Sequence, residues 1–201
     1  MIVEDNKSRC TGCMACVQKC PFSAINVYLD DEGFYYPEVN KKLCHNCNAC
    51  AKVCPISAKR TNDIQSQSSP IAYACYSKDK FVREQSSSGG LFSLLAKRVL
   101  ANGGMVVGAA FDKNFNVKHV CIYDDKDLFQ LRGSKYVQSD VNNTFIVVRE
   151  ELESGRNVLF TGTMCQVAGL LHYLGKPYDN LLTIDILCHG VPSVKLWHKY
   201  L

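Results

Sequence analysis

The 201-residue sequence lacks several features that mark common classes of protein. It has no uninterrupted apolar run of about 18 residues, so we predict no membrane-spanning segment. Its first residues, MIVEDN, are not a basic stretch leading into an apolar one, so we predict no signal peptide. We therefore expect a cytoplasmic protein. The sequence also has no block of five or more basic residues and no base-stacking motif, so we expect no nucleic-acid partner.

Cysteine, in contrast, is abundant: there are 12, and a pattern of four is written twice in the first 55 residues. Each copy follows the spacing C-x2-C-x2-C-x3-C-P, and the copies are 34 residues apart. This spacing is typical of bacterial ferredoxins that bind two 4Fe-4S clusters. We therefore predict an α+β, ferredoxin-like two-cluster domain over residues 1–58.

The fourth cysteine of each run is expected to ligate the cluster held by the other run. Disulfides would need an oxidising compartment, which nothing in the sequence indicates. Zinc prefers two separated C-x2-C pairs, which leaves the remaining cysteines and the prolines unexplained. Because each oxidised cluster adds roughly −2, the formal net charge of +4 is no evidence for a polyanionic partner. The predicted ligands are Cys10, Cys13, Cys16 and Cys54 for one cluster, and Cys20, Cys44, Cys47 and Cys50 for the other.

Two further patterns divide the chain. Residues 24–28 and 34–37 alternate around an Asp/Gly-rich turn and are predicted to form a hairpin between the cysteine runs. Residues 59–70, KRTNDIQSQSSP, are polar and without periodicity, and we predict a linker there.

The remaining segment, 71–201, alternates between strand-like and helix-like patterns, which indicates an α/β domain with a parallel or mixed sheet. The chain stops at Leu201 inside the last predicted helix, so we expect this domain to be incomplete at its C-terminus. The predicted strands are 71–76, 105–111, 117–123, 157–160 and 181–187, and the predicted helices are 91–100, 127–131, 141–154, 165–174 and the segment from 194 onward.

Five blocks in this segment carry a resemblance. They are SSSGGLFSLLAKRVL, GGMVVGAAFD, LRGSKYVQSD, VLFTGTMCQVAGL and IDILCHGVPSVKLW. Together with the paired cysteine runs, they resemble the beta-subunit family of hydrogenases and dehydrogenases that use the deazaflavin coenzyme. The resemblance implies an iron–sulfur flavoprotein, as a rule with FAD, that passes electrons between clusters and a deazaflavin or another organic acceptor. It also implies a redox partner protein or subunit. The alternative is a non-catalytic electron-transfer subunit that docks on a catalytic partner.

The residues themselves are compatible with a flavin site. A Ser/Gly-rich loop directly before a helix favours phosphate binding, although a plain helix cap is the alternative. Arg132 and Lys135 lie on a Gly-containing loop that either meets a pyrophosphate or is a solvated turn. Family members often have proline where this chain has Met164, in a second strand–loop–helix junction. No catalytic residue is predicted. The predicted flavin contacts are Ser87, Ser88, Gly89, Gly90, Arg132, Lys135, Thr163 and Gln166.

Four cysteines fall outside the two runs. Cys165 and Cys188 each follow a predicted strand, at the edge where α/β sheets bind ligands. They are either contacts to a further cluster or to the flavin, or half-buried thiols. Cys75 and Cys121 lie inside strand patterns, so we predict that both are core residues. Asp185 in the last predicted strand is expected to be buried.

Overall fold

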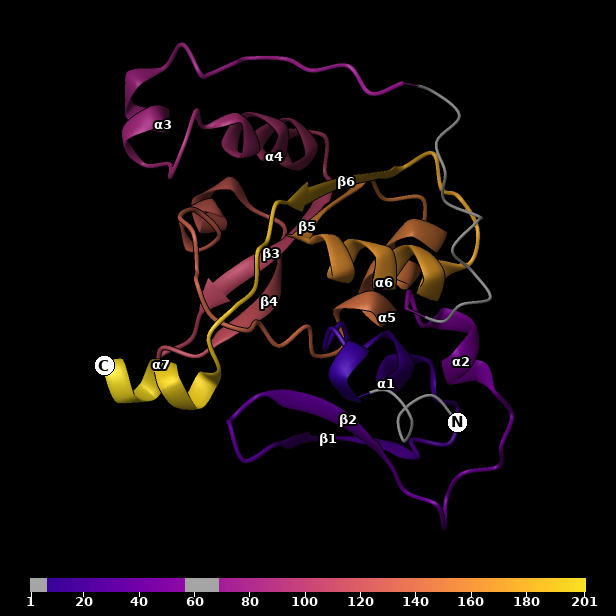
Figure 1. The fold of residues 1–201 in the computed structure, drawn as a ribbon. Helices are drawn as coiled ribbons and strands as arrows, with labels where there is room; N and C mark the ends of the chain where they lie inside the picture. The colour runs from indigo at the N-terminus through magenta and orange to yellow at the C-terminus, as the bar shows by residue number, and fades with distance from the viewer. Residues whose placement is uncertain (1–6, 57–68) are drawn as a thin grey trace.

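The computed structural model describes residues 7–56 and 69–201, and Figure 1 shows their arrangement. A small N-terminal region that contains both cysteine runs packs against a larger α/β region. The predicted linker, 59–70, lies outside the described residues except for its last two. Within the described ranges, no helix is long and apolar enough to cross a membrane.

The N-terminal region is a ferredoxin-like α+β unit. Its two strands pair antiparallel, with Ile25 opposite Val39, which confirms the predicted hairpin. The Asp30 carboxylate fixes the turn, because it accepts hydrogen bonds from the backbone N–H groups of Glu32 and Phe34 at 3.1 and 2.9 Å. The elements are η1 (Lys7–Arg9), α1 (Ala15–Lys19), β1 (Ile25–Leu29), β2 (Tyr35–Val39) and α2 (Ala49–Val53).

The 34-residue repeat of the sequence is also a repeat of backbone conformation. Gly12 and its counterpart Asn46 both have positive φ, 67° and 54°. Met14 and its counterpart Asn48, the residues before α1 and α2, are left-handed as well, with φ of 58° and 59°. Non-glycine residues rarely adopt this region. The same rare backbone in both copies therefore indicates that the cysteine spacing requires it.

The larger region is built on a four-stranded mixed sheet of order β4-β3-β5-β6. β3 pairs antiparallel with β4 and parallel with β5, and β5 pairs parallel with β6. This confirms the predicted α/β class with a mixed sheet. β3 and β5 are central and almost wholly buried, as expected for strands covered on both faces. The strands are β3 (Met105–Phe111), β4 (Val117–Ile122), β5 (Val158–Thr163) and β6 (Leu181–Ile186).

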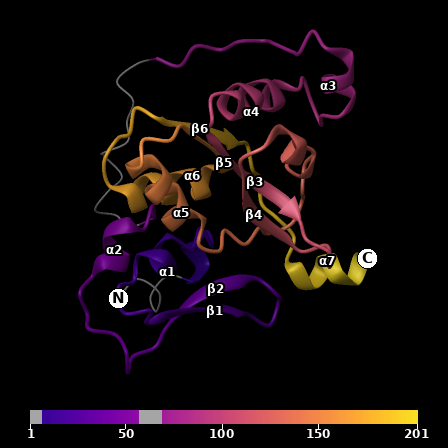
Figure 2. The ribbon, with the colours of Figure 1, turned by 180° about the vertical axis from the view of Figure 1, so that it is seen from behind.

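Helices cover both faces of this sheet, as Figure 2 shows from behind. Alternate strand residues face opposite ways. Val106 and Leu159 belong to the core under α4 and η2, whereas Val107 and Phe160 belong to the core under α5 and α6. The helices are α3 (Lys80–Glu84), α4 (Leu91–Ala101), η2 (Asp125–Gln130), α5 (Thr144–Glu153), α6 (Met164–Leu174) and α7 (Val194–Tyr200).

The N-terminal region shares a core with α5 and α6. Cys13, Met14 and Ala15 are buried in the same apolar cluster as Phe145 of α5 and Leu170 of α6. Burial of this kind stabilises by about 25 cal/mol for each Å² of apolar surface removed from water. The first cysteine run is therefore held against the α/β region by packing.

Hydrogen bonds fix the register of this contact. The Gln138 side chain pairs with both backbone groups of Tyr35 in β2, accepting from its N–H at 2.8 Å and donating to its C=O at 3.2 Å. Gln18 accepts from the Phe145 N–H at 2.9 Å, and Lys19 donates to the Tyr173 C=O at 2.9 Å. The N-terminal region is thus attached at defined points.

Three expectations from the sequence are wrong. Residues 71–76 have no partner strand and are exposed; β-propensity alone does not make a strand where no neighbouring strand pairs with it. Cys75, in this segment, is exposed rather than a core residue. Asp185 is also exposed, because β6 is the outer strand of the sheet. Cys121 is half-buried and packs against the core, as predicted.

Candidate functional site

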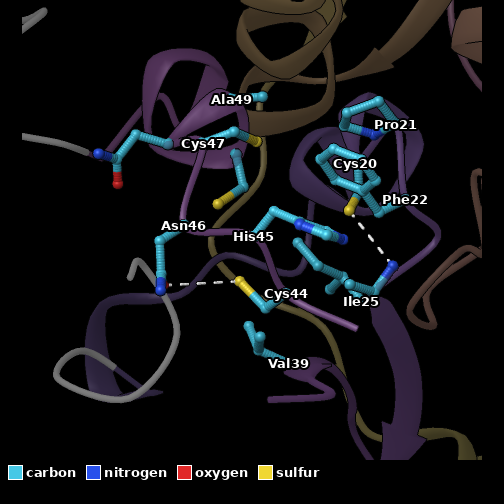
Figure 3. Close-up of a pocket in the computed structure, with 13 residues that line it drawn as sticks. Cys20, Pro21, Phe22, Ile25, Val39, Cys44, His45, Asn46, Cys47 and Ala49 are labelled. Carbon is cyan, nitrogen blue, oxygen red and sulfur yellow. Dashed lines mark hydrogen bonds between the residues drawn. The ribbon is translucent and has the colours of Figure 1, made fainter. Parts of the chain in front are cut away.

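The second cysteine run borders a hollow, and Figure 3 shows the residues that line it. Cys44, Cys47 and Cys50 line this hollow together with Cys20, the last cysteine of the first run. The hollow contains about 400 Å³ of empty space, part of it open to solvent. The predicted set of four cysteines is thus gathered around one cavity, which we call the second site.

Polar and aromatic contacts order the walls of the second site. The Cys20 Sγ accepts a hydrogen bond from the Ala24 N–H at 3.3 Å, and the Cys44 thiol lies 3.8 Å from the Asn46 Oδ1 (Figure 3). The His45 ring packs on Phe22, with 4.2 Å between the ring centroids. The cysteine loop is therefore anchored to the segment that follows α1.

The other predicted set, which we call the first site, is Cys10, Cys13, Cys16 and Cys54. Burial is the main cause that raises the pKa of Cys10, Cys13 and Cys16, to about 11 for Cys13. The charge of the Cys54 thiolate adds to the rise for all three. Cys54 consequently lies near the first three cysteines, although 38 residues separate it from Cys16.

The thiols and backbone of these loops fit an iron–sulfur cluster. Grouped thiols with raised pKa repel one another when ionised, and a cationic metal core removes that repulsion as it displaces their protons. Backbone N–H groups at Gly12 and Ala15 lower the pKa of Cys10 and Cys13 by hydrogen bonding to the sulfurs. Left-handed residues in such loops turn successive N–H groups inward, an arrangement that recurs at Fe–S sites. Within the described residues, no three His, Cys, Asp or Glu side chains are arranged to hold a single metal ion.

The two sites differ in their surroundings. Cys13 and Cys16 are only 8% exposed, and a Cβ placed on Gly169 of α6 would lie 3.2 Å from the Cys13 Sγ. Gly169 therefore lets α6 approach the first site closely. Cys47 of the second site is exposed. The first site faces the α/β region and the second faces solvent.

Cys165 lies beside the first site, and Cys188 lies elsewhere on the surface. The charge of Cys165 contributes to the raised pKa of Cys10 and Cys13, and its Sγ lies 3.1 Å from the Thr163 Oγ1. Cys188 follows β6 and is exposed, with its Sγ 3.7 Å from the Gly190 C=O. The structure thus distinguishes two cysteines that the sequence treated alike.

The predicted flavin contacts fall into two groups, and the first is gathered at the start of α4. Gly90 precedes α4 in the left-handed region, φ 79°, and no side chain caps the helix. Arg132 donates from Nε to the Ser93 Oγ in the first turn at 3.1 Å. The Ser87 Oγ accepts from the Ser134 N–H at 2.9 Å, which ties the two loops together. Uncapped N–H groups beside a guanidinium form an anion-binding arrangement.

Lys135 and Gly89 in the same group have local structural roles. The Lys135 ammonium donates to the C=O groups of Gln130 and Arg132 at 3.1 and 2.8 Å, and burial lowers its pKa to about 8. A Cβ on Gly89 would lie 2.8 Å from the Cys75 C=O, so close backbone packing explains the glycine. Ser88 is exposed on the same loop.

The second group, Thr163 and Gln166, lies at the start of α6. The Gln166 Oε1 accepts from the Thr163 N–H at 2.9 Å, and Gln166 is 7% exposed. A side chain that satisfies the N–H of the residue before a helix is a capping arrangement. The hydrogen bonds of this pair therefore stabilise the strand-to-helix junction, although the pair stays a predicted flavin contact.

A buried histidine that the sequence did not single out supports the end of β5. The His119 Nε2 lies 3.1 Å from the Thr161 C=O, so the ring donates there, and its Nδ1 lies 2.8 Å from the Ser139 Oγ. The ring stacks on Phe160 at 5.6 Å between centroids. Burial lowers the pKa of His119 to about 4, so its ring is neutral.

Sequence reasoning also missed Gly169, Ser93 and Gln138, because each contacts a residue that is distant in the chain.

Comparison with known proteins agrees with these features. The 4Fe-4S dicluster domain matches residues 9–59. The family of coenzyme F420 hydrogenase/dehydrogenase beta subunits matches, through its N-terminal part, residues 72–145. The fold and the cysteine sites thus define an iron–sulfur protein of the electron-transfer class. The match over residues 72–145 is to the family that the sequence resemblance predicted.

No curated protein matches the chain, whereas 12 chains of solved structures do. One is in a xenon-derivatised structure of the F420-reducing NiFe hydrogenase complex from Methanosarcina barkeri. It is 23% identical, with a TM-score of 0.48 over 63% of this chain and 48% of that one. The chain therefore spans about half the length of this solved relative.

Proposed function

We propose that the protein binds two 4Fe-4S clusters and FAD, and transfers electrons between a redox partner and an organic acceptor such as a deazaflavin. Bound clusters supply one-electron steps, and a bound flavin supplies the exchange between single electrons and electron pairs. The observation that carries the proposal is the gathering of Cys20 with the second cysteine run around one hollow. One cysteine from one run and three from the other is the combination that a two-cluster ferredoxin uses.

The chain's own residues hold and shield the clusters in this proposal. The first set (Cys10, Cys13, Cys16, Cys54) and the second set (Cys20, Cys44, Cys47, Cys50) supply the thiolates. The Gly12 and Ala15 N–H groups donate to sulfurs of the first set, and the Ala24 N–H donates to the Cys20 Sγ of the second; these bonds stabilise the negative charge of the thiolates. The packing of α6 on Cys13, which is 8% exposed, reduces contact with water on that side of the first site, and hydrogen bonds to a sulfur are stronger where water is scarce.

The start of α4 is the proposed phosphate-binding part of the FAD site. Arg132 would hold the pyrophosphate bidentately while Ser93 fixes its side chain. Ser87, Ser88 and the N–H groups after Gly90 would complete the cradle. Lys135 would contribute positive charge beside Arg132. Thr163 and Gln166 are proposed to contact the flavin from the α6 side.

A titration of the purified protein with FAD tests this assignment. The Arg132→Ala variant removes a charge-assisted contact of about 1.5–3 kcal/mol, so binding of FAD should weaken about tenfold or more. Arg98→Ala is the matched control, because Arg98 is an exposed arginine near the other end of α4. Equal weakening in both variants would exclude the start of α4 as the phosphate site.

The second candidate function is that of a non-catalytic electron-transfer subunit. The hydrogen bonds of Lys135 to its own loop, and of Gln166 to its own helix start, favour it, because both side chains already have partners. Wild-type protein with a full complement of iron that neither contains nor takes up FAD would establish this second function over the first.

A further inference from the structure

The open face of the second site has the composition of a protein-docking surface. Phe22 and Cys47 line the second site, and Leu43 directly precedes Cys44 in the sequence. Phe22 is 44% and Leu43 48% exposed, and Cys47 is exposed as well. Exposed apolar side chains beside a redox site allow a partner to approach without stripping water from charged groups. At the first site, α6 packs closely on Cys13, which is 8% exposed.

Positive charges predominate around this face. From residue 39 to residue 56 the sequence has no Asp or Glu, whereas Lys42 and Lys52 are both exposed. Neither lysine takes part in an ion pair with any residue of the described ranges. The acidic residues of the described N-terminal region all lie within 30–38, on the hairpin.

The hairpin end is already occupied. Its turn contacts α7, where the Val194 N–H donates to the Gly33 C=O at 3.2 Å and Lys195 donates to the Asp31 C=O at 2.9 Å. Figure 1 shows α7 and α2 on opposite sides of the molecule. The turn of the hairpin, which carries Asp30, Asp31 and Glu32, therefore contacts the α/β region, whereas Glu38 lies at the other end of the hairpin, beside Val39 of the second site.

We propose that this open face, formed by Phe22, Leu43, Cys47 and the flanking Lys42 and Lys52, docks an acidic one-electron carrier protein of the ferredoxin type. The inference rests on the proposed function, since it needs a cluster at the second site. In the electron-transfer step the reduced carrier loses one electron and the second site gains it; no bond forms or breaks. The lysines meet carboxylates of the carrier and offset its repulsion from a cluster that itself carries roughly −2.

The test is stopped-flow reduction of the cluster-loaded protein by a reduced, acidic bacterial 4Fe-4S ferredoxin. The variant is Lys42→Glu with Lys52→Glu. Its control is Lys113→Glu with Lys199→Glu, which makes the same change of charge at exposed positions. Lys199 is in α7, and Lys113 is two residues before Phe115, whose C=O accepts a hydrogen bond from Trp197 of α7. At low ionic strength the rim variant should react at least about tenfold more slowly than wild type, and the gap should close as salt is added. The control should stay within about twofold of wild type.

An unchanged rate in the rim variant, or an equal loss in the control, would overturn the proposal, as would a wild-type protein that the ferredoxin does not reduce. Iron content and low-temperature electron paramagnetic resonance of each sample distinguish failure of the docking surface from failure of the proposed function. Wild-type protein without two clusters contradicts the proposed function itself. Variants with both clusters and wild-type rates contradict only the docking surface.

Discussion

Acidification should destabilise the fold through His119. Burial lowers the pKa of His119 to about 4 in the folded protein, compared with about 6.5 in an unfolded chain. Between these values the unfolded state binds a proton that the folded state does not. The stability that neutral His119 contributes is therefore complete above about pH 6.5 and is lost as the pH falls toward about 4.

The size of this effect follows from the same shift. Within the window, stability falls by about 1.4 kcal/mol for each pH unit. From about pH 7.5 to about pH 5.5 the loss amounts to about 1.3 kcal/mol. For a chain of 201 residues, such a loss lowers the melting temperature by about 3 to 5 °C.

Thermal unfolding of wild type and His119→Gln, followed by circular dichroism across this pH range, measures the effect. Glutamine can donate to the Thr161 C=O and accept from Ser139 but does not titrate. The variant should be less stable at about pH 7.5, and the gap to wild type should shrink by about 1.3 kcal/mol on acidification. A gap that stays constant or widens would refute the assignment of a neutral, buried His119.

Three further outcomes are expected. Cys20→Ala should remove the cluster of the second site and spare that of the first, so that iron falls from about eight to about four per chain and one resonance signal is lost. Loss of the first-site signal instead would contradict the assignment of Cys20 to the second set. Gly169→Ala places a Cβ 3.2 Å from the Cys13 Sγ, which should cost about 1–3 kcal/mol of stability and shift the first-site signal. Higher helix propensity offsets up to about 1 kcal/mol of this cost. A higher melting temperature with an unchanged signal would contradict the close contact. Gln138→Ala should expose the Tyr35 N–H, seen as faster hydrogen exchange at that amide, and destabilise the protein by about 1–3 kcal/mol through two lost bonds.

The features that local chemistry dictates could be predicted from the sequence. The cysteine spacing indicated the repeat, and the structure shows matching left-handed residues at Gly12 and Asn46. The continuous apolar run predicted β3 over 105–111, as observed, because a central strand is apolar on both faces. β5 extends to Thr163, beyond the predicted end at Phe160, since its pairing with β6 continues through Gly162, a residue that disfavours strands by itself.

The features that depend on a distant residue could not be predicted. Nothing near Gly169 in the sequence indicates that the Cys13 side chain would pack against it. Cys165 and Cys188 follow adjacent parallel strands and gave the same local signal, yet of the two only Cys165 contributes to the raised pKa of Cys10 and Cys13. Residues 71–76, which include the exposed Cys75, have the sequence pattern of a strand, but within the described residues no neighbouring strand pairs with them.

Quantification of iron, acid-labile sulfide and flavin on one anaerobically purified sample tests the central claim most directly. Two clusters held by crossed cysteine sets predict about eight irons and about eight sulfides per chain, with about one flavin. About four irons or fewer, with one set of cysteines open to alkylation, would contradict the two-cluster assignment.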